Sequence, residues 1–217
     1  MTVFIIILIY FAIGGIATAV VNKRKPAEAK QRWVKYITYF VIVLTMIAMI
    51  WYGAFLLASV IIITIGLVEM VLVGKNKRNV MTIGLVVYAV IAWLFILYAQ
   101  TSYALALYVV VLTFDGFSQI SGQLFGKHKL ASKVSPGKTV EGLIGGLLIA
   151  VLTSYLLHEN IVTGLIICAA ALAGDLLASF YKRKCGVKDY SNLIPGHGGV
   201  LDRFDSLIFA CAVCLLI

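Results

Sequence analysis

A group of ionisable side chains lies near the end of a chain that is otherwise strongly apolar. Three of them and one serine hydroxyl have the spacing i, i+4, i+7 and i+8, namely Asp175, Ser179, Lys182 and Arg183. Residues with this spacing share one stripe of a helix. Two cations at the end of a helix could serve only to anchor it in the membrane. A carboxylate on the same stripe favours a functional site instead.

A second group of charges follows a segment rich in glycine. Asp202 and Asp205 are three residues apart and would share a helical face, whereas Arg203 would point elsewhere and pair with an acid or a phosphate. The preceding residues 195–199 (PGHGG) cannot form a regular helix, and Gly198 and Gly199 would let backbone N–H groups approach an anion. A simple turn between helices is the alternative interpretation. The D-R-x-D sequence directly after it favours an anion site.

A third charged segment, residues 126–146, contains Gly137-Lys138-Thr139. It is not a P-loop, because that motif needs a glycine where this chain has Ser132, and we expect no strand before it. We expect Ser135 and Pro136 to be the N-cap and first residue of a helix. The segment would then present lysines beside a helix N-terminus, where a polyphosphate binds favourably. These are Lys127, Lys129, Lys133 and Lys138.

Together these segments predict carboxylates inside a pocket and cations around its rim. Carboxylate oxygens near substrate phosphates suit Mg²⁺ and phosphoryl or nucleotidyl transfer at a membrane surface. A zinc site is not supported, because no Cys-Cys-His set is present. A serine hydrolase is poorly supported too, since there is no G-x-S-x-G sequence and the three histidines fall in expected loops.

The elements that must position these residues are transmembrane helices. Of the 217 residues, 62% are hydrophobic and 12% charged, and the mean hydropathy is +1.05. The fold class is therefore all-α, a polytopic membrane protein. Eight spans are expected, at 2–21, 35–52, 54–74, 81–99, 102–124, 139–157, 161–180 and 200–217. Six spans, with long tilted helices in place of the adjoining pairs, is the alternative.

The basic residues give the orientation. All of the 18 lysines and arginines except Arg203 lie in or beside the connections that follow the first, third, fifth and seventh spans. By the positive-inside rule these connections face the cytoplasm and both termini face outward. The connection 22–35 is basic and amphipathic, which suits an anionic membrane surface. We expect a multi-pass protein of the plasma membrane with its site facing the cytoplasm.

The chain is expected to be a single membrane domain, 1–217, with two unlike parts. Residues 1–100 form apolar scaffold helices, in which Glu69 is the only acid inside a span. Residues 101–217 form the catalytic helices and loops. Their acids at membrane depth are Asp115, Glu141, Asp175, Asp202 and Asp205. Ionisable groups at such a depth are costly and usually functional.

The segment from Ser179 to Asp205 resembles the signature of the phosphatidate cytidylyltransferase family. The shared pattern is a serine, then Lys-Arg, Lys-Asp, Pro-x-His-Gly-Gly and Asp-Arg-x-Asp. Residues 115–146 are similar to a second block of that family, and Gly174-Asp175-Leu176 resembles the residues before the signature. The resemblance covers residues 113–206. Tyr181 departs from it, because the family usually has an aliphatic residue or phenylalanine there.

The resemblance implies that CTP and phosphatidate react to give CDP-diacylglycerol and pyrophosphate with Mg²⁺. The acids that match the metal ligands are Asp175 and Asp202, and a second metal ion is left open. Further acids that would support the metal or contact the nucleotide are Asp205, Asp189 and Asp115. Groups that would hold phosphates or orient acids are Ser179, Lys182, Arg183, Lys188, His197 and Arg203. Lys133 and Lys138 would close over the triphosphate, with Ser135, Gly198 and Gly199 as further substrate contacts.

The expected partners are CTP, phosphatidate in the inner leaflet and the bilayer, without nucleic acid; a homodimer is considered as a further assembly. Three alternatives stay open. A cation transporter would explain the intramembrane acids, but lysines crowded on one side would repel its cargo. A CTP-dependent lipid kinase, of the dolichol- or phytol-kinase kind, differs in the phosphorus atom attacked. A catalytically inactive homologue is disfavoured, because every expected acid and cation is present.

Overall fold

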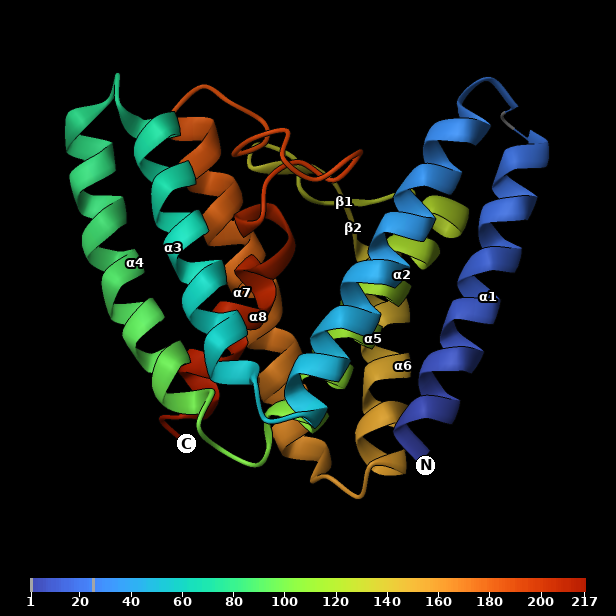
Figure 1. Cartoon of the computed structure of the whole chain (residues 1–217). Coiled ribbons are helices and arrows are strands. Elements are labelled where there is room, and N and C mark those ends of the chain that lie inside the picture. Colours follow the sequence, from blue (N-terminus) through green and yellow to red (C-terminus); the bar gives the residue numbers. More distant parts are fainter. Residues whose placement is uncertain (1, 25) are drawn as a thin grey trace.

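The computed structural model describes residues 2–24 and 26–217, and these form eight α-helices, a 3₁₀ turn and a β-hairpin (Figure 1). The first four helices are α1 (Thr2–Arg24), α2 (Ala29–Trp51), α3 (Phe55–Gly74) and α4 (Arg78–Tyr98). The last four are α5 (Ala104–Phe125), α6 (Val140–Leu156), α7 (Ile161–Lys184) and α8 (Leu201–Cys214). The 3₁₀ turn is η1 (Pro26–Glu28), and the hairpin strands are β1 (Lys129–Ala131) and β2 (Ser135–Thr139). The all-α prediction is confirmed.

Each of the eight expected spans corresponds to one helix, but the helices differ in length. In the described residues six of them, α1 to α5 and α7, are long and apolar enough to cross a membrane. Helices α6 and α8 have 17 and 14 residues. At about 1.5 Å per residue they reach only about 25 and 21 Å, less than a bilayer core of about 30 Å. Both were expected to be longer, at 139–157 and 200–217.

The alternative of long, continuous helices is wrong. The first adjoining pair breaks between Trp51 and Phe55, where Gly53 has a φ of +71° that a side chain would disfavour. The second breaks between Tyr98 and Ala104, across Gln100-Thr101-Ser102. Both breaks lie where interfacial or turn-forming residues interrupt the apolar run.

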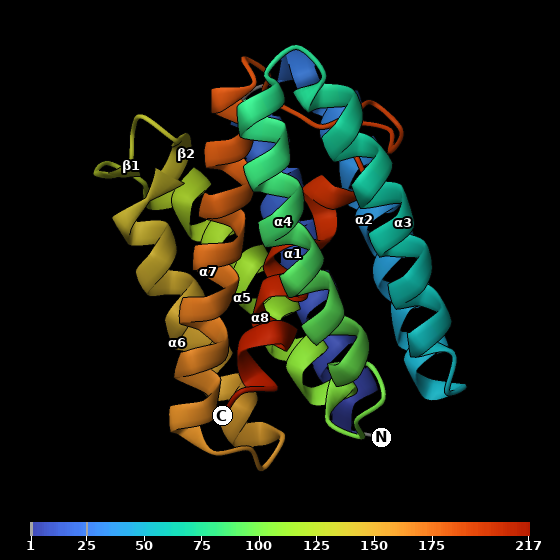
Figure 2. The ribbon, with the colours of Figure 1, turned by 90° about the vertical axis from the view of Figure 1, so that its left-hand side faces the viewer.

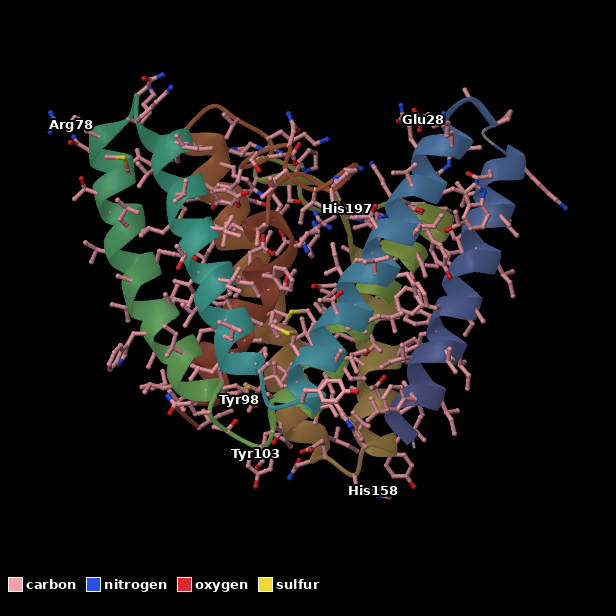
Figure 3. All side chains as sticks on the ribbon, viewed as in Figure 1. Glu28, Arg78, Tyr98, Tyr103, His158 and His197 are labelled. Carbon is pink, nitrogen blue, oxygen red and sulfur yellow. The ribbon has the colours of Figure 1, made fainter. Side chains whose placement is uncertain are left out.

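All four basic connections lie at one end of the helix bundle, and both termini lie at the other (Figures 1 and 2). The end with the termini carries exposed aromatic side chains typical of a membrane interface, among them Trp51, Tyr52, Tyr103 and Tyr155. Figure 3 shows Tyr103 at this end and Arg78 and Glu28 at the opposite one. This arrangement agrees with the alternation that the basic residues predicted.

Close packing in the second half depends on small residues. Helices α5 and α6 pack along each other, and a Cβ atom on Gly146 would lie 2.7 Å from the carbonyl oxygen of Phe114. Helix α7 packs on α8 in the same way, since a Cβ atom on Gly174 would lie 2.8 Å from the carbonyl oxygen of Asp205. Small residues of this kind let membrane helices approach closely. Helices α3 and α4 then cover α8 from the other side.

Two expectations for this segment are wrong. Ser135 and Pro136 belong to β2 and not to a helix, and strand β1 precedes Gly137-Lys138-Thr139, where no strand was expected. The residue before a proline prefers extended backbone, which suits Ser135 to a strand. Helix α6 begins later, at Val140, where Thr139 is the N-cap and its hydroxyl oxygen accepts the N–H of Gly142 at 3.1 Å. Strands β1 and β2 are antiparallel and bring Lys129 opposite Thr139. The hairpin therefore folds back over the basic end of the bundle.

Candidate active site

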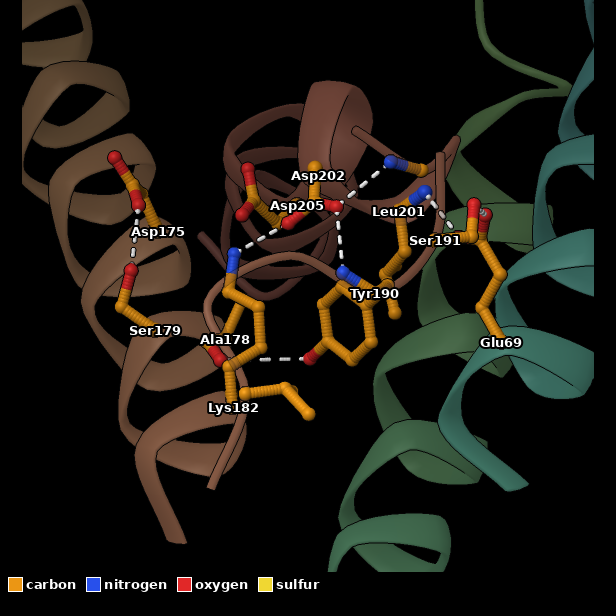
Figure 4. A network of polar contacts seen from close by, with 12 residues as sticks. Glu69, Asp175, Ala178, Ser179, Lys182, Tyr190, Ser191, Leu201, Asp202 and Asp205 are labelled. Atoms are coloured by element: carbon orange, nitrogen blue, oxygen red, sulfur yellow. Dashed lines mark hydrogen bonds and ion pairs between the residues drawn. The ribbon is translucent and has the colours of Figure 1, made fainter. Parts of the chain in front are cut away.

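Three of the four expected stripe residues share one face of α7. The hydroxyl of Ser179 donates to Oδ1 of Asp175 at 3.2 Å, and Lys182 lies one turn further along (Figure 4). Arg183 turns aside. Its Nε donates to the carbonyl oxygen of Val134 at 3.2 Å and its Nη1 to that of Val187 at 3.1 Å. Arg183 therefore ties the hairpin and the loop after α7 to the helix, which is a positioning contact.

Strand β2 of the hairpin places Lys138 beside the carboxylate of Asp175 on α7. The Nζ of Lys138 lies 2.5 Å from Oδ2 of Asp175, and both side chains are partly buried. Asp115 of α5 and Asp205 of α8 lie within electrostatic range of the same lysine. Burial lowers the pKa of Lys138, but Asp175, Asp115 and Asp205 together outweigh it and raise that pKa above its usual value. Lys138 is therefore a cation among acids from three helices.

A second lysine–aspartate pair lies deeper. Nζ of Lys182 is 2.5 Å from Oδ1 of Asp202, and these side chains are 9% and 1% exposed. Oδ2 of Asp202 accepts the backbone N–H groups of Tyr190 and Gly199, each at 2.8 Å. Asp202 lies in the first turn of α8 and reaches back to Gly199, the residue before the N-cap Val200. Asp202 thus joins α7, the loop 185–200 and the start of α8.

The segment 195–199 forms the tight turn that its glycines predicted. Gly196 and Gly198 have φ angles of +74° and +80°, and Ile194 pairs with Gly198 in a β-bridge. The N–H groups that follow do bind anions, but these anions are carboxylates of the chain itself. Asp202 accepts the N–H of Gly199, and Glu69 accepts those of Val200 and Leu201. Substrate contacts by Gly198 and Gly199 stay a prediction.

Glu69 is the residue that the sequence interpretation missed. It lies on α3, only 4% exposed, and its carboxylate reaches the loop before α8. The signal was present, because Glu69 is the only acid inside a span of the first hundred residues, and such an acid calls for an explanation.

His197 and Arg203 face α2 at the same end of the molecule. The His197 ring stacks on Tyr39 at 6.1 Å between centroids, and Figure 3 shows it next to α2. Burial, and then the positive charge of Arg203, hold the pKa of His197 below its usual value, so the ring is neutral at neutral pH. Arg203 is exposed on α8 and lines a cavity of about 30 Å³ with Tyr39 and Asp115.

The remaining expected residues lie at the rim. Lys133, Lys188 and Asp189 are exposed on the loops of the basic end, and Ser135 is partly buried in β2. A larger cavity, of about 350 Å³, lies at the opposite end between residues 50–56 and 99–104. Its lining is apolar apart from hydroxyl and amide groups such as Gln100 and Thr101, so it lacks the charges that phosphate chemistry needs.

Comparison with known proteins identifies the family of the chain. The model of the cytidylyltransferase family matches residues 2–217. The phosphatidate cytidylyltransferase of Rickettsia bellii (strain RML369-C) is 34% identical over 209 residues, which cover 85% of this chain and 81% of that protein. The chain belongs to the phosphatidate cytidylyltransferase family. The Rickettsia typhi (strain Wilmington) enzyme is also 34% identical, over 88% of this chain and 94% of that protein.

Family membership extends over both halves of the chain. The family model includes the first hundred residues, which the signature motifs do not reach. A shorter match, 48% identical over 122 residues, links the chain to the phosphatidate cytidylyltransferase of Haemophilus influenzae (strain Rd) and covers 49% of this chain and 42% of that protein. The helices that carry Glu69 and Tyr39 therefore belong to the family architecture too.

The donor groups fit the magnesium ion expected for a cytidylyltransferase. Asp175 and Asp202 each hold a lysine ammonium at 2.5 Å, so both carboxylates already bind a cation. In the described part of the chain no three His, Cys, Asp or Glu side chains are close enough to hold a metal by themselves. Magnesium is usually bound by one or two carboxylates together with substrate phosphates and water. Such a site needs no more protein ligands than this.

Proposed function

We propose that the chain makes CDP-diacylglycerol and pyrophosphate from CTP and phosphatidate at the basic end of the bundle. The observation that carries the proposal is the two lysine-bound carboxylates, Lys138–Asp175 and Lys182–Asp202. Lys138 belongs to the hairpin and Lys182 to the last turn of α7, where the apolar helix meets the polar loops. One substrate comes from water and the other from the bilayer, so a site at this boundary can receive both.

Asp175 and Asp202 are the proposed ligands of Mg²⁺, and Asp115, Asp205 and Asp189 are proposed as supporting acids. The metal supplies positive charge to the phosphates when it is bound. Lys138, with Lys133 further out on the hairpin, would hold the triphosphate of CTP. A phosphate oxygen of phosphatidate attacks the α-phosphorus, and pyrophosphate leaves. Cations fixed around both anions lower this barrier without a covalent intermediate.

The lipid phosphate is assigned to the side of the site that faces α2. Arg203 is exposed there, and the neutral ring of His197 lies beside it. Lys182 orients Asp202, and Ser179 orients Asp175 through its hydrogen bond of 3.2 Å. Lys188 lies on the exposed loop, at the mouth of the site. The basic end is proposed to face the cytoplasm of a plasma-membrane protein, because 17 of the 18 lysines and arginines lie in or beside its connections. A homodimer stays a prediction.

The test uses purified protein in detergent with phosphatidate and Mg²⁺, and CTP labelled at either the α- or the γ-phosphorus. Nucleotidyl transfer puts the α-label into lipid and the γ-label into pyrophosphate. A CTP-dependent lipid kinase would put the γ-label into lipid, which would contradict the proposal. EDTA should abolish labelling and added Mg²⁺ should restore it. If neither the α-label nor the γ-label enters lipid, the transporter or the inactive homologue would be the explanation.

A further inference from the structure

The carboxylate of Glu69 joins the apolar half of the molecule to the loop of the proposed site. Its Oε1 accepts the hydroxyl of Ser191 at 2.7 Å and the N–H of Val200 at 3.0 Å. Its Oε2 accepts the N–H of Leu201 at 2.8 Å. Figure 4 shows Glu69 reaching from α3 towards Ser191 and Leu201, on the side of the network opposite Asp175. The donors lie more than 120 residues away in the sequence.

These contacts satisfy the N-terminus of α8. Val200, the N-cap residue, has no side-chain capping bond of its own. The first N–H groups of a helix need acceptors and carry a partial positive charge, which favours an anion. Asp202 takes the N–H of Gly199, and Glu69 takes the next two. Asp202 therefore holds the residue before the N-cap, and Glu69 caps the helix itself from a different part of the chain.

All three donors point at the Glu69 oxygens, so the carboxylate acts purely as an acceptor. The site is also tight, because a Cβ atom on Gly199 would lie 2.4 Å from Oε1. Glutamine at this position would keep the shape but turn an NH₂ group toward N–H or O–H donors. Aspartate would keep the charge but shorten the reach by one methylene group.

We propose that Glu69 is a positioning residue, which holds the loop 191–200 and the first turn of α8 so that Asp202, Arg203 and Asp205 face the substrates. The inference rests on the proposed function for its catalytic part only. Asp202 follows directly after the two N–H groups that Glu69 binds, and its own carboxylate is 1% exposed. A displacement of the helix start therefore moves Asp202 together with Lys182. A misplacement of about 1 Å in such a site lowers the rate about 100-fold.

The test compares Glu69→Gln and Glu69→Asp with Ser59→Ala in the full-length protein. Ser59 is buried on the same helix, and its hydroxyl donates to the carbonyl oxygen of Phe55 in that helix at 2.9 Å. We expect Glu69→Gln to lower kcat about 100-fold with less than a threefold change in KM for CTP, Glu69→Asp to recover part of kcat, and Ser59→Ala to match the wild type. Folded fraction is measured by size-exclusion chromatography and thermal unfolding, and kcat is given per folded molecule.

A second readout does not depend on the reaction. Lys188 is exposed in the loop after α7, so trypsin cleavage there reports how firmly the loop is held. We expect cleavage to be at least tenfold faster in Glu69→Gln than in the wild type or Ser59→Ala. Unchanged cleavage and unchanged kcat per folded molecule in Glu69→Gln would overturn the inference. If the wild type makes no CDP-diacylglycerol, the proposed function fails, but the cleavage rates still decide whether Glu69 holds the loop.

Discussion

The two halves of the molecule differ in where their charges lie. In α1–α4 the charges lie near the basic end, and Glu69 is the only acid at membrane depth. In α5–α8 and the loops between them, the acids Asp115, Asp175, Asp202 and Asp205 meet the lysines of two ion pairs. The apolar half nevertheless touches the site directly, because α3 and α4 pack against α8 and Glu69 binds the start of that helix.

A second contact between the halves lies one residue before Lys182. The hydroxyl of Tyr181 donates to the carbonyl oxygen of Met70 at 3.0 Å, and its ring lies over Gly84. A Cβ atom on Gly84 would be 2.4 Å from that ring. Two contacts therefore join the apolar half to the proposed site: the buried carboxylate of Glu69, and the ring of Tyr181 packed against Gly84.

The largest effects are expected within the second half, at the two carboxylates. Asp175→Asn and Asp202→Asn should each lower the rate of CDP-diacylglycerol formation about 1,000-fold, because each removes a proposed metal ligand. Their effects on stability should differ. Asp202→Asn leaves Lys182 buried without its partner, which costs about 3–5 kcal/mol, whereas Lys138 beside Asp175 is 21% exposed and its pair contributes only about 1 kcal/mol. Thermal unfolding in detergent and product formation measure the two effects separately.

Equal losses of stability in the two variants would contradict this difference in burial. Wild-type activity in Asp175→Asn would remove that residue from the proposed metal site. The matched control is Glu159→Gln, an acid at the opposite end of the bundle in the connection before α7, which should change neither quantity.

An intermediate effect is expected at the seam between the halves, where Tyr181 of α7 packs against Met70 of α3 and Gly84 of α4. Gly84→Ala places a methyl group against the buried ring of Tyr181 and should lower the free energy of unfolding by about 1–3 kcal/mol. Gly14→Ala is the control in the same half, because its Cβ would lie 3.5 Å from Tyr36, an ordinary contact. Alanine favours a helix by up to about 1 kcal/mol over glycine, so Gly14→Ala should be neutral or stabilising.

The double variant Gly84→Ala/Tyr181→Leu decides whether the ring is the cause. Its loss of unfolding temperature should be smaller than the sum of the losses in the two single variants, because the smaller side chain leaves room for the methyl group. Additive losses would mean that Gly84 matters for a reason other than Tyr181.

Much of the fold could be predicted from the sequence, because hydropathy and the positions of lysines depend on the bilayer alone. The eight helices, their breaks near Gly53 and Thr101, and the placement of the basic loops all follow from it. The hairpin could not be predicted in this way. Ser135-Pro136 is equally typical of a helix start and of an extended segment, and only the cap at Thr139 settles where α6 begins.

Most residues of the proposed site could be predicted from the sequence, but the contacts between them could not. Spacing on α7 indicated that Asp175, Ser179 and Lys182 share a face, but Arg183 turns to the hairpin because Val134 lies within its reach. Glycines at 196–199 indicated an anion-binding turn, but no pattern within one segment could indicate that Glu69 supplies the anion. That contact depends on how α3 packs against α8, a relation between distant parts of the chain.

The smallest effect is expected from Tyr181→Phe, which separates the hydroxyl at the seam from the ring. The change removes one hydrogen bond of 3.0 Å to Met70 and should cost about 1 kcal/mol of stability. Met70 lies within α3, where its carbonyl also accepts a helical N–H, so the loss leaves no unpaired buried acceptor. The ring keeps its place over Gly84, and product formation should stay within twofold of the wild type. A loss of tenfold or more in kcat at unchanged stability would mean that the hydroxyl acts on the chemistry through Lys182, and that the seam contributes to catalysis and not only to packing.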